Sequence, residues 1–226
     1  MMKIAIDGPA GAGKSTVARR VAQELGFVYI DTGAMYRALT WKALKEGRNF
    51  DDPLDLRQMA LQTSIQFKNA DHEQKVFCDD IDISKEIRLP RVSSLVASLS
   101  RHPEVREVMV KQQQEMACTQ SVVMDGRDIG ECVLPDAEFK FFLTATLEER
   151  ARRRAREMNI ADGTPELLSL EEDIMARDHS DSERQIGALK VLPDSIVIDS
   201  SYMHIDEVLN KVLTIIKETD SALYGS

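Results

Sequence analysis

The sequence predicts an α/β fold of the P-loop NTPase type, in which helices flank a parallel sheet and an inserted subdomain and a short lid are added. Short apolar segments with strand character alternate with helical segments, which is typical of an open parallel sheet covered on both faces. The turn between the first strand and the first helix, at residues 8–15, fits the pattern G-x-x-x-x-G-K-S/T. Polar residues follow the other expected strands, at the sheet edge where ligands of such folds bind.

The first expected element is Lys3–Asp7, a short buried strand that leads into the glycine-rich turn. The helix after the turn has one apolar face, because apolar residues recur there at helical spacing. The last helix, roughly residues 204–218, repeats this spacing and is expected to cover the sheet. The apolar face of the first helix consists of Val17, Ala18, Val21, Ala22 and Leu25. The other expected strands of the sheet are residues 28–30, 121–124, 140–143 and 195–198.

The stretch between Arg37 and Ser121 interrupts the alternation of strands and helices. It is too long for a single crossover connection, so it is expected to form a subdomain. Residues 64–68 and 75–78 predict two antiparallel strands, and the turn residues at 69–72 would join them.

A charged region near residue 150 predicts a lid. Residues 158–165 form a short glycine-containing connection between two charged helices, which indicates a small mobile flap. Five arginines precede it, and two interpretations stay open for them. They form a solvated helix face with i,i+4 ion pairs, or one of them closes over a transferring phosphate, which the position next to the flap favours. These arginines are Arg150, Arg152, Arg153, Arg154 and Arg156.

Residues 8–15 predict a loop that binds the phosphates of a nucleoside triphosphate. Its glycines let successive backbone N–H groups turn onto phosphate oxygens, and the positive end of the next helix points at the same anion. Lys14 is expected to reach the β- and γ-phosphates, and the Ser15 hydroxyl is expected to hold Mg²⁺. An ordinary glycine-rich turn is the alternative, but the strand and helix on either side favour phosphate binding. The residues expected at the phosphates of ATP are Gly8, Pro9, Ala10, Gly11, Ala12, Gly13, Lys14, Ser15 and Thr16.

Composition limits the class of protein and its partners. The 226 residues, 43% of them hydrophobic, suffice for one enzyme-sized unit, and the net charge of -9 argues against nucleic acid as a partner. Neither a signal peptide nor a membrane span is recognisable, so a cytoplasmic protein is expected. Cys78, Cys118 and Cys132 lack C-x-x-C spacing and are expected to be reduced and mostly buried. The histidines are scattered without ligand spacing, so Mg²⁺ is the one metal expected.

Five further motifs follow the glycine-rich loop in order: residues 31–37 (DTGAMYR), 103–106 (PEVR), 125–130 (DGRDIG), 177–184 (RDHSDSER) and 198–201 (IDSS). Together they resemble the bacterial cytidylate kinases, nucleoside monophosphate kinases that phosphorylate CMP and dCMP. The resemblance runs nearly end to end and implies a single P-loop kinase domain over residues 1–226. Its parts would be a core of residues 1–31, 121–150 and 190–226, a monophosphate-binding subdomain at about 32–120 and a lid at about 151–178.

The resemblance implies transfer of the γ-phosphoryl of ATP to CMP or dCMP, with Mg²⁺ as cofactor. Arg37, Arg127 and Arg184 would hold the acceptor phosphate, and Asp181 with Arg177 would contact the sugar. Arginine forks suit this chemistry, because two anionic nucleotides must be brought together. The acceptor oxygen is already ionised, so no general base is required. The implied catalytic residues are Lys14, Arg127, Arg184 and Asp128.

The resemblance also implies that Arg106 and Asp128 read the cytosine. The carboxylate can accept from the N4 amino group, and the guanidinium can donate to N3 and O2. Uracil reverses two of these groups, so binding it would leave buried polar groups badly paired. Ala97 departs from the family, which usually has a base-reading serine there, and Ser98 is adjacent. Thr32 keeps the hydroxyl of a more frequent serine and is expected to contact CMP.

Two other functions stay open. One is a different nucleoside monophosphate kinase, acting on UMP or AMP, and the other is a nucleotide-dependent binding switch. The chain lacks an N-K-x-D guanine reader, and its arginine set has no use without a second anion. An internal salt bridge is the alternative role for Arg127 and Asp128, although their place beyond a strand end favours a site. The expected partners are small-molecule nucleotides, without nucleic acid or membrane, and the expected state is a monomer.

Overall fold

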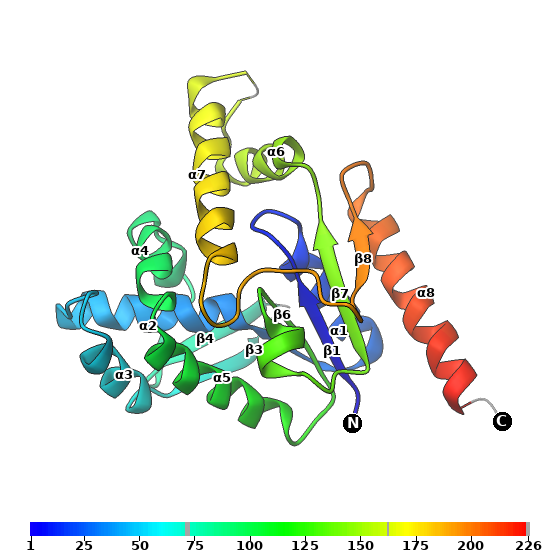
Figure 1. Cartoon of the computed structure of the whole chain (residues 1–226), viewed down its shortest axis with the longest axis horizontal. Helices are drawn as coiled ribbons and strands as arrows, with labels where there is room; N and C mark the ends of the chain where they lie inside the picture. Colours follow the sequence, from blue (N-terminus) through cyan, green and yellow to red (C-terminus); the bar gives the residue numbers. More distant parts are fainter. Residues whose placement is uncertain (71–72, 162, 225–226) are drawn as a thin grey trace. The chain divides into compact units, whose positions relative to one another are not determined.

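The computed structural model of the chain describes residues 1–70, 73–161 and 163–224 (Figure 1). Its larger sheet has five strands in the order β2-β6-β1-β7-β8. The pairs β1 with β6, β1 with β7 and β7 with β8 are parallel, so the predicted parallel sheet flanked by helices is confirmed. These strands are β1 (Lys3–Asp7), β2 (Val28–Asp31), β6 (Val122–Gly126), β7 (Phe139–Thr144) and β8 (Ile196–Asp199).

Helices α1 (Lys14–Leu25) and α8 (Ile205–Tyr224) pack their apolar faces against one face of this sheet. Alternate residues of a strand point to the same face, so β1 and β7 each contribute every second side chain to this core. The predicted apolar face of α1 is confirmed, and α8 continues beyond its predicted end at residue 218. The shared core includes Ile4, Ile6, Val17, Val21, Phe141, Leu143, Val208 and Val212.

The chain packs as two compact units, Met1–Tyr29 with Thr119–Ser226, and Ile30–Cys118. The described residues of the second unit form four helices, a small three-stranded sheet and a 3₁₀ turn at Glu86–Arg88. Its elements are α2 (Thr32–Glu46), α3 (Pro53–Leu61), β3 (Ile65–Ala70), β4 (Glu73–Cys78), β5 (Ile81–Asp82), α4 (Pro90–Ser100) and α5 (Pro103–Ala117).

The predicted hairpin in this second unit is confirmed, since β3 and β4 pair antiparallel with Ile65 opposite Cys78. The pairing reaches Ala70, so the first half of the predicted turn belongs to β3, and residues 71–72 lie outside the described residues. The helix predicted to begin at Pro103 is also present. The helix α3 was not predicted, although Asp52 caps it by accepting the backbone N–H groups of Leu54 and Asp55.

In the first unit, two charged helices follow β7, namely α6 (Leu147–Met158) and α7 (Pro165–Ser182). The short connection predicted between them is confirmed. Asn159 ends α6 in the left-handed region, with a φ of 57°. A π-helical turn, Ile129–Val133, follows β6, and its first two backbone N–H groups donate to Asp7 at the end of β1.

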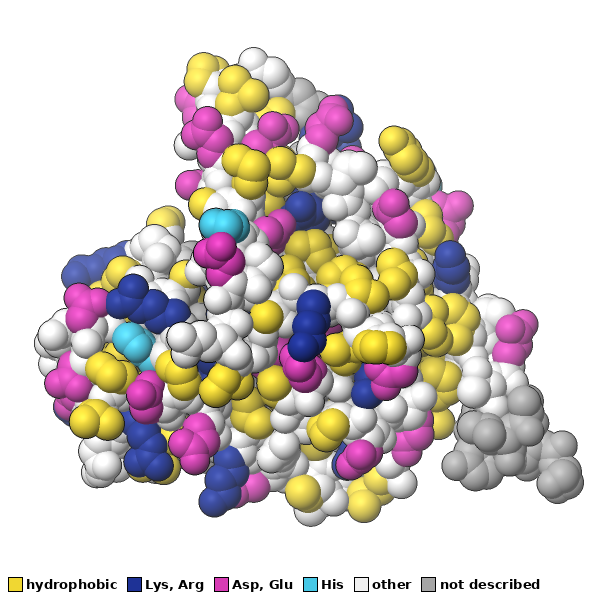
Figure 2. All heavy atoms as spheres, viewed as in Figure 1, with side chains coloured by type: hydrophobic (Ala, Val, Ile, Leu, Met, Phe, Trp, Pro, Cys, Tyr) yellow, Lys and Arg dark blue, Asp and Glu magenta, His cyan; other side chains and the backbone are white. Residues whose placement is uncertain are grey.

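The prediction of mostly buried cysteines is wrong, because Cys78 alone is buried while Cys118 is exposed and Cys132 is half-buried. Cys118 caps the end of an amphipathic helix, and periodicity does not reveal whether a helix end faces solvent. None of the described helices combines the length and apolarity needed to cross a bilayer. On the face drawn in Figure 2, acidic and basic side chains are interspersed, in keeping with the mixed charge of the sequence.

Candidate active site

The glycine-rich loop joins the carboxyl end of β1 to the start of α1, as predicted. Gly8 has a φ of +147°, and a Cβ there would lie 2.0 Å from the carbonyl oxygen of Leu143, so no other residue fits. Gly11 has a φ of +76° and packs against Arg150. Gly13 occupies the N-cap of α1 in the left-handed region, and no side chain among the described residues caps this helix. The first N–H groups of α1 are therefore left for an anion.

Lys14 lies at the start of α1 and is 6% exposed. Its Nζ donates a hydrogen bond to the carbonyl oxygen of Pro9, at 2.7 Å. Burial lowers the pKa of Lys14 well below its ordinary value, and the positive charges of Arg127 and Arg177 lower it further. A bound phosphate would supply the negative charge that stabilises the ammonium form. Arg127 is one of the arginines predicted at the acceptor phosphate, and Arg177 is the arginine predicted at the sugar.

The hydroxyl of Ser15 donates to Oδ2 of Asp125, at 2.8 Å. The hydroxyl of Tyr29 donates to Oδ1 of the same carboxylate, also at 2.8 Å. A hydroxyl beside a carboxylate is an oxygen donor set that suits Mg²⁺, which P-loop enzymes hold through a loop Ser/Thr and a strand-end Asp. The described residues contain no cluster of three or more His, Cys, Asp or Glu side chains suited to a metal. Mg²⁺ in nucleotide enzymes is commonly bound by one or two protein groups together with substrate phosphates and water.

Asp125 carried no predicted role, although with Ser15 it forms the oxygen donor set that suits Mg²⁺. The residue opens the motif at residues 125–130. The sequence does contain a sign of this role, because Asp125 directly follows the three apolar residues Val122–Met124 of β6. The register of the sheet places Asp125 near the phosphate loop, since it pairs with Ile6 of β1, one residue before the end of that strand.

Asp7, at the end of β1, carries a perturbed carboxyl group. It is 6% exposed and accepts the backbone N–H groups of Ile129 and Gly130, each at 2.8 Å. Burial raises its pKa from 3.8 to about 6, although the two hydrogen bonds oppose the shift. The negative charge of Asp128 adds to the rise, and the positive charge of Lys14 opposes it.

Because of Asp7, we expect the free energy of unfolding to fall as the pH rises from about 4 to about 6. The folded pKa of about 6 exceeds the unfolded value of 3.8, so the folded chain binds more protons in this range. The stabilisation is complete below the unfolded pKa and is lost as the pH passes the folded pKa, with a size of about 3 kcal/mol at most. Urea unfolding of the unmodified protein and of Asp7→Asn, at about pH 4.5 and about pH 7, measures the effect. A difference in stability between the two proteins that is the same at both pH values would contradict this assignment.

Asp181 of α7 lies between two of the predicted phosphate-binding arginines. It is 2% exposed, accepts from Nε of Arg127 at 2.6 Å and forms an ion pair with Arg184. Burial alone would raise its pKa, but the charges of Arg127 and Arg184 outweigh burial and hold the pKa below its ordinary value. The carboxylate thus stays ionised and fixes both guanidinium groups. Arg127 therefore pairs with Asp181, and the contact of Asp181 with a sugar stays a prediction.

Three other predicted residues, Thr32, Arg37 and Arg106, lie in the second unit. Asp31 caps α2 by accepting the N–H of Ala34 at 2.7 Å, and its other oxygen pairs with Arg37 at 3.0 Å. The Nε of Arg37 is buried without a hydrogen-bond partner among the described residues, so this guanidinium retains a donor for an anion. Arg106 is buried on α5 and lies over the ring of Tyr36, at 5.7 Å from its centroid.

The arginine run of α6 divides into two groups. Arg150 donates to the carbonyl oxygen of Ala10 at 3.0 Å and pairs with Asp178, which accepts the N–H of Ala10 at 3.2 Å. Arg153 donates to the carbonyl oxygen of Ala12 at 3.2 Å and to Ser200. These two arginines support the phosphate loop through its backbone.

The second group forms a solvated helix face, which was one of the two interpretations of the arginine run. Arg152 pairs with Glu148 of the same helix, and Arg154 pairs with Glu157. Arg156 is exposed. Which arginine meets a transferring phosphate stays a prediction.

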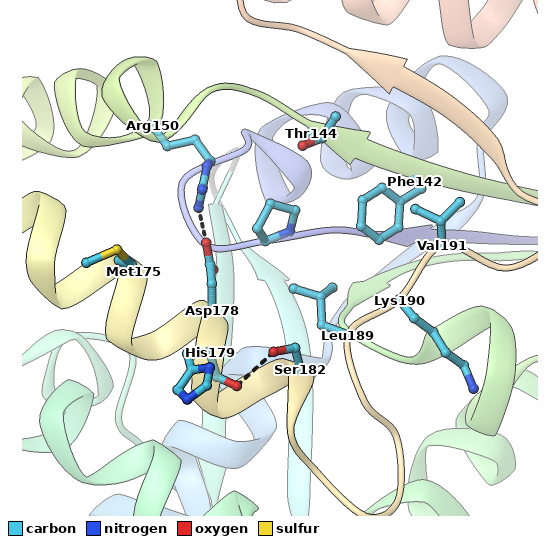
Figure 3. Close-up of a pocket in the computed structure, with 11 residues that line it drawn as sticks. Phe142, Thr144, Arg150, Met175, Asp178, His179, Ser182, Leu189, Lys190 and Val191 are labelled. Carbon is cyan, nitrogen blue, oxygen red and sulfur yellow. Dashed lines mark hydrogen bonds and ion pairs between the residues drawn. The ribbon is translucent and has the colours of Figure 1, made fainter.

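A pocket of about 500 Å³ lies beside the phosphate loop, lined by Pro9 of the loop and by Phe142 and Thr144 of β7 (Figure 3). Phe142 alternates with Phe141, which belongs to the core under α1 and α8, so the pocket lies on the other face of the sheet. Figure 3 shows the Arg150 and Asp178 pair at its edge. Neither Lys14 nor Ser15 lines this pocket. The pocket therefore lies next to the phosphate loop but does not include the two loop residues expected to bind phosphate and Mg²⁺.

The loop, the paired Ser15 and Asp125, and the arginines around Asp181 define a P-loop kinase. The sequence model of one family, described as cytidylate kinase, matches residues 4–218. The chain belongs to the cytidylate kinase family and is an enzyme of that family.

Curated relatives agree with this family over most of their length. A cytidylate kinase from Desulforamulus reducens is 52% identical over 211 residues, which cover 93% of this chain and 95% of that protein. Another, from Geobacillus kaustophilus, is 48% identical, with 96% of this chain and 97% of that protein covered. Among solved structures, an uncharacterized protein from Eubacterium ventriosum shares the fold, with a TM-score of 0.51, 11% identity, and 96% of this chain and 99% of that chain covered.

Proposed function

We propose that this enzyme transfers the γ-phosphoryl group of ATP to CMP or dCMP, giving CDP or dCDP and ADP. Its membership of the cytidylate kinase family supports this reaction. The observation that supports it most directly is that α7 contacts the phosphate loop through Asp178 and, three residues on, pairs Asp181 with Arg127 and Arg184. The proposed donor and acceptor groups therefore lie on neighbouring segments. A nucleotide switch has no use for a second group of cations beside the phosphate loop.

We propose that the phosphate loop holds the donor through backbone N–H groups and through Lys14, whose charge is best stabilised by β- and γ-phosphate oxygens. Mg²⁺, held at Ser15 and Asp125, would neutralise charge that develops on those phosphates. Arg127 and Arg184, both fixed by Asp181, would bind the acceptor phosphate as preorganised forks. Arg37 would supply a further fork from the second unit. The attacking oxygen is ionised, so the site needs position and charge and no general base.

A substrate panel tests the reaction. ADP release should be rapid with CMP or dCMP, slow with UMP or AMP, and close to background without an acceptor. Equal rates with UMP or AMP would favour another nucleoside monophosphate kinase. ATP hydrolysis that does not depend on CMP would favour the nucleotide-dependent switch.

The base is proposed to be read by Arg106 and Asp128, both of which are buried. Asp128 would accept from the N4 amino group, and Arg106 would donate to N3 and O2. With Ala97 in place of a hydroxyl, these two charged groups carry more of the recognition unless Ser98 contributes.

Replacing Asp128 by alanine is expected to weaken the discrimination against UMP. The change leaves the N4 amino group of CMP without its acceptor, at about 1–3 kcal/mol, and removes the repulsion of the uracil carbonyl. The ratio of kcat/KM for CMP over UMP should fall by about ten- to a hundredfold. Steady-state kinetics measures the ratio, with exposed Asp136→Ala as the matched control. A ratio that stays unchanged in folded Asp128→Ala would place base recognition elsewhere.

We also propose that the phosphoryl transfer depends on Mg²⁺, that it takes place in the cytoplasm and that the enzyme is a monomer. We further propose that residues at about 151–178 act as a lid and that residues at about 32–120 bind the monophosphate. Analytical ultracentrifugation tests the monomeric state, because a dimer would have twice the 25.4 kDa mass of the chain.

A further inference from the structure

The carboxylate of Asp125 is held by hydrogen bonds on both of its oxygens. Ser15 donates to Oδ2 and Tyr29 donates to Oδ1, each at 2.8 Å. A single hydrogen bond leaves a carboxylate free to turn about its last torsion, whereas two donors on different oxygens fix the plane of the group. Ser15 keeps lone pairs on its oxygen while its proton is held by Asp125, so the hydroxyl can still face a cation.

Tyr29 is well placed to act as a fixed donor. It lies on β2, beside β6 that carries Asp125, and its side chain is 7% exposed. The guanidinium of Arg19, from α1, lies 5.8 Å from the centre of its ring. The ring is therefore held by packing and by a cation, and the hydroxyl has little freedom to leave Asp125.

We propose that Tyr29 is a positioning residue for the Mg²⁺ of the bound nucleotide and that it acts through Asp125. The inference rests on the proposed function to the extent that a metal and a nucleotide phosphate bind at Ser15. Mg²⁺ demands near-ideal octahedral geometry and gives up water reluctantly, so the direction of each oxygen at its site matters. Outer groups that orient the ligands of a metal contribute about ten- to a hundredfold to its affinity.

The variant Tyr29→Phe removes one hydroxyl and keeps the ring and its contact with Arg19. We expect the affinity of Mn²⁺ for the complex of the protein with ADP to fall about tenfold. Mn²⁺ is a suitable probe because it also prefers oxygen ligands in octahedral geometry. The free Mn²⁺ signal in electron paramagnetic resonance reports the affinity without any turnover. The affinity for ADP in the presence of EDTA, measured by calorimetry, should stay unchanged, because the loop and Lys14 are intact.

The matched control is Tyr202→Phe, which removes a hydroxyl from a side chain that is 96% exposed and should leave both affinities unchanged. A merely structural role for Tyr29 would weaken ADP binding with and without metal by the same factor, and that result would overturn the proposal. So would an unchanged Mn²⁺ affinity in folded Tyr29→Phe. Adding Tyr29→Phe to Asp125→Asn should cause no further loss of Mn²⁺ affinity, because Tyr29 acts through that carboxylate. Failure of the unmodified protein to bind Mn²⁺ with ADP would contradict the proposed function instead.

Discussion

Lys14→Ala should reduce phosphoryl transfer by about a thousandfold while leaving the protein folded. The ammonium group is proposed to lie beside the β- and γ-phosphates, and its charge is needed most where negative charge develops. The fold should tolerate the change, because burial lowers the pKa of Lys14 and its removal therefore relieves a desolvated charge.

A coupled assay of ADP release measures the rate, and circular dichroism checks the fold of the variant. The matched control is Lys211→Ala, which removes an exposed lysine from α8 and should leave the rate unchanged. Normal turnover in folded Lys14→Ala would mean that the glycine-rich loop is a structural turn, and the assignment of the donor site would fail.

Arg184→Ala should lower kcat/KM for CMP by about a hundredfold and should change the affinity for ATP little. Arg184 follows the end of α7 and is fixed by Asp181, and its fork is proposed to meet the acceptor phosphate alone. The remaining pair of Arg127 with Asp181 still neutralises the buried carboxylate, so the loss of stability should stay at about 1–3 kcal/mol.

Calorimetry with CMP and with a non-hydrolysable ATP analogue separates the two affinities. Arg184→Lys serves as the matched control, because it keeps the charge and removes the planar fork, and we expect an intermediate loss. Equal losses of affinity for both nucleotides in Arg184→Ala would show that the arginine has only a structural role.

The sequence by itself determined the features whose causes are local. The phosphate loop could be predicted because Gly8, Gly13, Lys14 and Ser15 lie within one eight-residue motif, and the conformation of the loop requires these residue types in that order. The parallel sheet followed from apolar segments that alternate with helices, and the apolar faces of α1 and α8 followed from helical spacing.

Tertiary structure decided which distant groups meet. Asp125 reaches Ser15, 110 positions away, only because β6 pairs with β1 in one register. The arginines of α6 are the same residue type, so the sequence alone does not distinguish their roles. Arg150 nevertheless supports the phosphate loop while Arg152 pairs with its own helix, because packing selects the face of α6 that turns inward. Local propensity contains no information about such long-range contacts. The pairing of Ser15 with Asp125, and of Asp181 with Arg127, therefore required the folded chain.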